Sequence, residues 1–375
     1  MQNLRRIPFT SSAYKITFLN FLFSFSMSAS LVFMPLYAED LGASNLMVGL
    51  IRSSYGVAFL VSAFIFGRQS DLHGRLIFIR LGLGLAAGAY LLQIIAPGPI
   101  LLLLIRAAVG FCLGIAISSI MAYVHESGSR IGRVAAFGSL GWAASAAVAA
   151  AVNEYDVLFI ASAVAVLLAL LASFTLREER QAPIDVAVFP LDIIWANRKI
   201  YLPFLLRHMG ATSIWAIFPL FLVDIGASKS WIAILWGINY GGQFVAMLFV
   251  QRFNPTRMFT VGLILSISVF TVYAIATDYI QLVPVQICLA IGWSCLYIGA
   301  LSFLLRNNLE RGTAVGLLYS ATQLGNSVGP FIGGAVSQLW GFRAVMYCAA
   351  GLTSAGLLAS RGASAGVGRL VKRTE

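Results

Sequence analysis

The residues of this sequence that could bind another molecule stand inside long apolar runs, and most of them are basic. Arg52, Arg106 and the adjacent Arg207 and His208 each interrupt such a run, whereas no Asp or Glu lies near the middle of one. A guanidinium group binds a carboxylate or phosphate through two parallel hydrogen bonds, and a buried site for a cation usually contains a carboxylate. The pattern favours an anionic or zwitterionic ligand. Alternatively, Arg52 and Arg207 extend to the membrane surface, since each lies about two helical turns from the end of its run.

No arrangement of residues for catalysis or metal binding is visible. The three histidines, His73, His125 and His208, fall in separate segments without an H-E-x-x-H pattern. The four cysteines lie in apolar runs without a C-x-x-C pair, and no G-x-x-x-x-G-K-S/T segment for nucleotide binding is present. We therefore expect no enzyme activity, no metal and no cofactor.

The composition is that of a membrane protein. Of the 375 residues, 59% are hydrophobic and 10% are charged, and the mean hydropathy is +0.88, whereas soluble domains carry about 25% charged residues. The net charge of +11 comes from short basic clusters between apolar runs. This distribution indicates membrane topology and not nucleic-acid binding.

Twelve apolar segments have about the 20 residues that cross a bilayer. They are residues 15–37, 46–66, 76–96, 99–123, 134–152, 157–176, 200–223, 230–250, 258–276, 280–304, 312–336 and 342–360. With twelve spans, both termini lie on one side of the membrane. Nearly all Lys and Arg residues between the spans fall on that side, and only Lys229 and Arg343 fall on the other. By the positive-inside rule we expect a multi-pass protein of the cell membrane with both termini in the cytoplasm.

An internal repeat divides the chain. The segments MPLYAEDLGAS, from Met34, and FPLFLVDIGAS, from Phe218, share Pro, Leu, Asp, Gly, Ala and Ser at an offset of 219 − 35 = 184. The same offset aligns SLGWAASA, from Ser139, with QLGNSVGP, from Gln323. Six spans per repeat give two halves of the same orientation, related by an axis along the membrane normal. We predict domains at residues 1–176 and 200–375, joined by a cytoplasmic linker at 177–199.

The linker combines charges and prolines with apolar residues. Val186, Phe189, Ile193 and Trp195 could lie in the cytoplasmic headgroup layer. A loosely ordered linker is an equally good interpretation.

The charged segment GRQSDLHGR, between the second and third spans, is suited to a tight turn with a breakable polar contact. Its glycines permit a sharp reversal, and its carboxylate could cap a neighbouring helix or bind an arginine. Here the chain resembles the major facilitator superfamily, whose pattern in this loop is G-x-x-x-D-x-x-G-R. The matching residues are Gly67, Asp71, Gly74 and Arg75, with Arg80 further along.

The resemblance implies that Asp71 is part of a conformational latch. In the family the corresponding aspartate contacts the start of the eleventh helix, here residues 311–316, and helps to hold the outward-open state. The matching loop of the second half, QRFNPTR from Gln251, lacks the aspartate and the glycines, so we expect a one-sided latch. The alternative is an ordinary polar turn.

The fourth span matches a second family pattern, R-x-x-x-G-x-x-x-G, at Arg106, Gly110 and Gly114. This spacing places the three residues on one helix face, where glycines permit close helix packing. We expect Arg106 to face the interior in a structural or proton-coupling role, with extension to the surface as the alternative. Glu126, beside His125 at the end of this span, is a candidate proton carrier or an interfacial charge.

A third pattern, rich in glycine and proline, occupies the fifth span in family exporters. Here that span has only Gly138 and Gly141, and the fuller version lies in the eleventh span. We predict close helix packing at both places, while the displaced proline weakens the inference to antiport. The residues in the eleventh span are Gly325, Gly329, Pro330 and Gly333.

The resemblance implies an all-α fold of two six-helix bundles and a secondary transporter that works by alternating access. We expect gradient-coupled export of a small organic or amphiphilic solute, anionic by the charge pattern, with the proton as a candidate coupling ion. An organic-anion symporter or exchanger, and a receptor or scaffold that transports nothing, remain as alternatives. The other partners we expect are lipids, and we expect a monomer that binds no nucleic acid.

Polar and aromatic residues in several spans complete a predicted central cavity that suits an amphiphile. Alternatively, many of them pack against lipid or neighbouring helices. The substrate-binding candidates are Arg52, Tyr55, Arg207, Trp215, Asn239, Tyr240, Gln243, Trp293, Gln323 and Asn326.

Overall fold

The computed structural model describes residues 11–127, 131–177, 190–308 and 310–361, and in these ranges the regular structure is helical. The helices are α1 (Ser11–Ala29), α2 (Met34–Asp40), α3 (Asn45–His73), α4 (Arg75–Leu92), η1 (Gln93–Ile95), α5 (Pro99–Glu126), α6 (Ile131–Val152), α7 (Tyr155–Ser173), α8 (Leu191–Ala196), α9 (Arg198–Asp224), α10 (Lys229–Val250), α11 (Pro255–Ile275), η2 (Tyr279–Gln281), α12 (Leu282–Asn307), α13 (Arg311–Trp340) and α14 (Phe342–Ser360).

Eleven helical segments of the described residues are long and apolar enough to cross a membrane. The one predicted span outside this set is the eleventh, 312–336, which lies in α13, a helix of 30 residues with a less apolar sequence. Its glycines and its side chains such as Gln323 and Asn326 lower the hydropathy. Large apolar side chains such as Phe64 and Leu171 are exposed on the outer surface, as expected of helices that face lipid.

The first predicted span, 15–37, is interrupted in the structure. Helix α1 ends at Ala29, and α2 begins at Met34 after a short turn. Pro35, at the start of α2, has no N–H to donate to the carbonyl of Leu31, so a continuous helix would lose a hydrogen bond here. The turn also places the hydroxyl of Ser30 beside Arg106.

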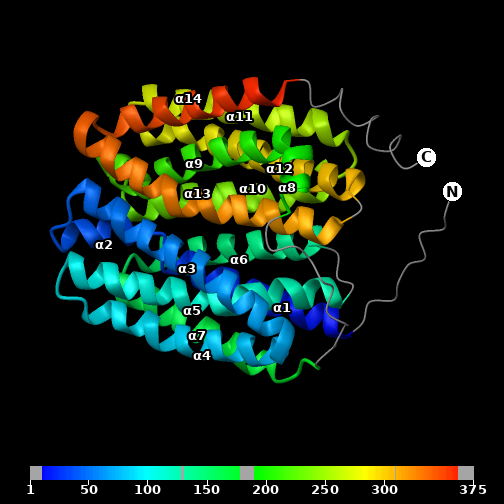
Figure 1. Cartoon of the computed structure of the whole chain (residues 1–375). Helices are drawn as coiled ribbons and strands as arrows, with labels where there is room; N and C mark the ends of the chain where they lie inside the picture. Colours follow the sequence, from blue (N-terminus) through cyan, green and yellow to red (C-terminus); the bar gives the residue numbers. More distant parts are fainter. Residues whose placement is uncertain (1–10, 128–130, 178–189, 309, 362–375) are drawn as a thin grey trace.

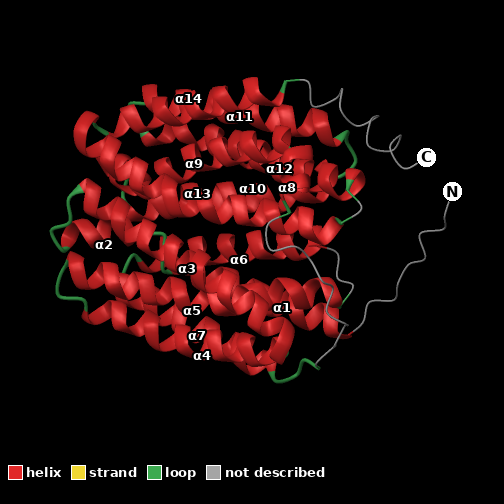
Figure 2. Ribbon diagram, in the orientation of Figure 1, coloured by secondary structure: helices red, strands yellow, loops and turns green. Residues whose placement is uncertain are grey.

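The helices form two groups that follow the sequence. In Figure 1, α1 to α7 occupy the lower half of the molecule and α9 to α14 the upper half, with the helices roughly parallel to one another. Figure 2 shows the same arrangement with only loops between the helices. The two groups meet mainly where α3 packs against α13 and α6 packs against α10. The all-helical fold of two six-helix bundles is therefore confirmed.

The repeated segments form the same turn in both halves. Gly42 and Gly226 have positive φ angles of 86° and 89°, a conformation that glycine adopts without strain. Two residues later, Ser44 and Ser228 accept hydrogen bonds from the backbone N–H groups at the starts of α3 and α10, which is the standard N-terminal cap of a helix. The same chain reversal thus precedes the second long helix of each half.

Of the predicted linker, residues 178–189, including Val186 and Phe189, lie outside the described residues. Ile193 and Trp195 belong to α8, where Trp195 is exposed and Ile193 is half-buried.

Glycines occur where helices approach most closely. A Cβ atom at Gly110 would lie 2.9 Å from the carbonyl carbon of Tyr55, so α5 packs directly on the backbone of α3. Gly114 lies against α3 in the same way, and Gly138 and Gly141 lie against α1. On α13, the glycines Gly325, Gly329 and Gly333 lie against the backbone or side chains of α9.

Contacts between the two halves begin at one end of the molecule and continue along it. We call the end with the turn at Gly42 the α2–α3 end, and the opposite end, with the turn at Gly74, the α3–α4 end. Near the α2–α3 end, the N–H of Leu46 donates to Gln338 over 3.4 Å, and Asn153 donates to Ser230 over 2.8 Å.

Further contacts between the halves extend toward the middle. The glycine pair Gly49 and Gly334 lets α3 and α13 approach closely, beside the carbonyl of Pro330. Ser53 donates a hydrogen bond to the carbonyl of Ser327. On the other side of the molecule, α6 and α10 remain in contact as far as Ser139 and Met247.

Candidate functional site

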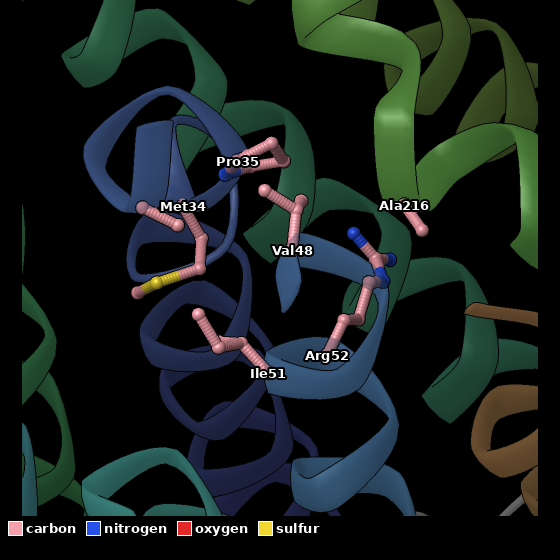
Figure 3. Close-up of a pocket in the computed structure, with 7 residues that line it drawn as sticks. Met34, Pro35, Val48, Ile51, Arg52 and Ala216 are labelled. Atoms are coloured by element: carbon pink, nitrogen blue, oxygen red, sulfur yellow. The ribbon is translucent and has the colours of Figure 1, made fainter. Parts of the chain in front are cut away.

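Arg52 lies at the junction of the two halves. It is half-buried on α3, and its Nη1 donates a hydrogen bond of 3.1 Å to the carbonyl of Trp215 on α9. Figure 3 shows its guanidinium directed toward Ala216, beside a small pocket between α2, α3 and α9. Tyr55 and Tyr240 lie in the neighbourhood of Arg52. A guanidinium so placed contacts both halves and retains donors for an anion.

A row of aromatic rings near Arg52 begins at Trp142 of the N-terminal half and continues into the C-terminal half. Their centroids are separated by 5.1 Å between Trp142 and Tyr240, 5.5 Å between Tyr240 and Trp236, and 6.3 Å between Trp236 and Trp215. From Trp215 the contacts continue to His208, at 5.8 Å, then to Trp293 and Tyr297. These spacings are those of favourable aromatic pairs. We call these seven residues, from α6, α9, α10 and α12, the central aromatic row.

A chain of hydrogen bonds on α13 ends at the central aromatic row. Gln323 Nε2 donates to the hydroxyl of Tyr319 over 2.9 Å, and Asn326 Nδ2 donates to Gln323 Oε1 over 2.7 Å. The Oδ1 of Asn326 then lies 3.1 Å from Nε2 of His208. Gly325 leaves room for the imidazole, since a Cβ there would lie 2.7 Å from its Cδ2.

Arg106 lies inside the N-terminal half and does not extend to the surface. Its side chain is fully buried, and its Nη1 donates to Ser30 Oγ over 3.0 Å and to Gln93 Oε1 over 2.9 Å. The guanidinium carbon is 4.6 Å from the ring centroid of Tyr55, a cation–π distance. Arg106 therefore connects α5 with the turn that follows α1, with η1 and with α3.

Arg207 is fully buried in the C-terminal half. Its Nε donates to Ser266 of α11 over 2.9 Å, and its guanidinium carbon lies 5.1 Å from the ring of Trp293 and 5.5 Å from that of Phe270. Arg207 thus touches the central aromatic row at Trp293, but its hydrogen-bond partner belongs to the interior of the same half.

Asn239 and Gln243 lie between α10 and α12. Gln243 donates to Asn239 over 2.7 Å, and Asn239 donates to the backbone of Gln286 over 3.2 Å. Both side chains are buried. The structure therefore does not place these two candidates with Arg52 and the aromatic rings.

The residues of the G-x-x-x-D-x-x-G-R pattern surround the turn at the α3–α4 end. Gly74, with φ of 102°, separates α3 from α4. Asp71 is half-exposed and forms an ion pair with Arg75, which also donates to Ser70 over 2.9 Å. The side chain of Arg311, at the start of α13, lies outside the described residues.

Two further predicted residues lie elsewhere. Arg80 is directed toward α7, where it donates to the Ser173 carbonyl over 3.4 Å and packs on Phe174. A Cβ atom added at Gly67 would lie 3.6 Å from the Cβ of Ser118 on α5, which is an ordinary van der Waals distance. The side chains of Glu126 and His125 lie outside the described residues.

Four aromatic residues at this site are not among the substrate-binding candidates predicted from the sequence: Trp142, Trp236, Tyr297 and Tyr319. Aromatic residues are common in apolar helices, so their type alone did not distinguish them. The spacing of Trp236 and Tyr240, four residues apart on one helix face, was the available signal.

A family model described as Major Facilitator Superfamily matches the chain over residues 16–239 and 200–365. Among curated proteins, the Multidrug resistance protein MdtG of Salmonella typhi is 26% identical over 369 residues, which cover 88% of this chain and 90% of that protein. MdtG of Salmonella arizonae is similar to the same extent.

Two solved structures share the fold. The nucleoside transporter NupG superposes with a TM-score of 0.73 at 14% identity and covers 95% of this chain and 99% of its own. The human organic anion transporter MFSD10 superposes with a TM-score of 0.74 at 15% identity and covers 95% of this chain and 100% of its own. At these identities the likeness concerns the fold alone.

Proposed function

Because this chain belongs to the major facilitator superfamily and is a transporter of that family, we propose that it moves a small organic or amphiphilic anion across the cell membrane by alternating access. In this mechanism the two halves rock about a central site and open it to one side at a time.

The placement of Arg52 is the observation that supports an anionic substrate most strongly. Arg52 joins the halves through Trp215 and lies beside Tyr55 and Tyr240. Among the described side chains, every Asp and Glu lies at a helix end or in a connection, so none offsets this charge near the middle of the membrane. The aromatic rings suit an apolar body, and the guanidinium suits a carboxylate, sulfonate or phosphate group.

Export is the direction we propose, with support from the curated relatives, whose name denotes multidrug resistance. The positive-inside rule supports a cytoplasmic α3–α4 end. The contacts near the α2–α3 end would then close the exterior side, and substrate would enter from the cytoplasm. An organic-anion symporter or exchanger on this fold is the alternative, and MFSD10 is described as an organic anion transporter. A receptor that transports nothing is a further alternative.

Replacing Arg52 with Gln should weaken transport of organic anions at least about tenfold, since hydrogen bonds to a charged group contribute about 1.5 to 3 kcal/mol. The measurement is uptake by proteoliposomes of a panel of labelled aromatic carboxylates and sulfonates, with matched aromatic cations. Arg257→Gln, at an exposed position at the start of α11, is the control. Transport of cations but not anions by the native protein would overturn the proposed substrate class, and absence of all flux would favour a receptor.

Asp71→Asn should slow transport about tenfold without preventing substrate binding. We propose that Asp71 forms its stabilising contact in the state closed at the α3–α4 end, and a hydrogen bond to a charged group contributes about 1.5 kcal/mol. The measurement compares the initial rate in proteoliposomes with the Kd in detergent. Asp192→Asn, which removes an exposed charge from α8, is the control. A native rate in Asp71→Asn would contradict the latch.

A further inference from the structure

His208 is distinctive among the described side chains of the membrane-spanning helices because histidine titrates near neutral pH in water. It is buried on α9 and belongs to the central aromatic row. Its ring stacks on Phe204 with centroids 5.9 Å apart and lies 5.4 Å from that of Trp293. Burial by itself favours the neutral ring, while aromatic faces also accommodate a cation.

The hydrogen-bond chain on α13 determines which nitrogen of His208 carries hydrogen. In the structure, Gln323 directs its NH2 group to the hydroxyl of Tyr319 and its Oε1 to the NH2 group of Asn326. Asn326 consequently presents Oδ1 to Nε2 of His208, over 3.1 Å. An amide oxygen can only accept a hydrogen bond, so Nε2 must be the donor.

In the neutral ring, this assignment leaves the lone pair on Nδ1. That atom is buried, and no hydrogen-bond partner for it occurs among the described residues. A proton can bind to Nδ1 while Nε2 continues to donate to Asn326, because both nitrogens of imidazolium are donors. Protonation therefore requires no rearrangement of the chain on α13.

The charged groups that interact electrostatically with His208 are both positive. Arg207 precedes it on α9, and Arg52 reaches it electrostatically from α3. Helix α12 contributes Trp293, and α13 contributes the neutral residues Asn326 and Tyr319. A proton on His208 would add a third positive charge to this group, whereas an anion bound by Arg52 would offset it.

We propose that Nδ1 of His208 is the atom that couples the proton to the anion: substrate binding favours protonation there, and protonation favours substrate binding. The reciprocity follows from thermodynamic linkage. The inference rests on the proposed transport of an anion, and it specifies how a proton would be coupled to that transport. A monoanion and a proton bound together move in the same direction, as in the symporter alternative, and leave the cell when the outward anion gradient exceeds the inward proton gradient.

The test uses 2-naphthalenesulfonate, an aromatic anion whose own charge is constant between about pH 5.5 and pH 8.5. For the native protein, the linkage should make the Kd at least about tenfold lower at about pH 5.5 than at about pH 8.5. A pH-sensitive dye inside proteoliposomes should report protons entering with the anion. His208→Gln, whose amide can still donate to Asn326, should bind with a Kd independent of pH and transport without protons. His73→Gln, at an exposed histidine of α3, should keep the native pH dependence.

Each failure has a separate meaning. If His208→Gln keeps the native pH dependence and proton movement, or if native transport carries no protons, the inference is wrong while the proposed function stands. If the native protein neither binds nor transports the anion at any pH, the proposed function fails and the inference falls with it.

Discussion

Replacing Gly56 with valine is expected to stop transport almost completely while each half stays folded. A Cβ atom at this position of α3 would lie 2.9 Å from the Cα of Ser327 and 2.9 Å from the carbonyl carbon of Asn326, both on α13. All these contacts belong to the other half, so the collision prevents the halves from meeting near the α2–α3 end. Overpacking of about 3 kcal/mol would lower the population of this closed state about a hundredfold.

Two measurements test this expectation. The first is the initial transport rate, and the second is the reaction of Ser53→Cys with a membrane-impermeant thiol reagent, in a background without the native cysteines. Ser53 bonds to Ser327 between the halves, so its reaction from the α2–α3 end should rise at least about tenfold when closure is lost. Gly88→Val, on α4 where a Cβ would meet nothing within 4 Å, is the control. Native transport by Gly56→Val would show that this contact is not part of the cycle.

Replacing Gly333 with alanine is expected to destabilise the C-terminal half. A Cβ atom would lie 2.8 Å from the carbonyl carbon and 2.9 Å from the Cα of Ser213 on α9. Backbone atoms cannot rotate away as a side chain can, so α13 and α9 must separate. The expected loss is about 3 kcal/mol, and valine should prevent folding altogether.

The measurement is the temperature at which purified protein loses its monodisperse peak in detergent. Gly351→Ala, on α14 with no atom within 4 Å of the added methyl group, is the matched control. It should melt at or above the native temperature, because alanine favours a helix by about 1 kcal/mol over glycine. Equal melting temperatures of the two variants would mean that α9 and α13 can accommodate a methyl group at Gly333 without separating.

The sequence alone determined the helical fold and the order of the spans. Apolar runs of membrane-crossing length can form only hydrogen-bonded helices in lipid. The number of membrane-spanning helices could therefore be counted from the apolar runs. The repeat also predicted equivalent turns, and Gly42 and Gly226 form them with nearly equal φ angles. The sequence did not predict the interruption of the first span at Ser30. A proline such as Pro35 can stand either inside a helix or at its start, and the sequence does not distinguish the two. The repeat position Pro219 lies inside the continuous helix α9.

Only the tertiary structure decided which of the polar residues lie together. Arg52, Trp215 and Tyr240 are brought to the junction of the halves, whereas Asn239 and Gln243 face α12 within one half. Adjacent residues were separated in the same way, with Arg207 directed to Ser266 and His208 to Asn326. The physical reason is that residues of one helix differ in direction by about 100° per position, and neighbours from other helices, which periodicity does not reveal, determine what each direction meets.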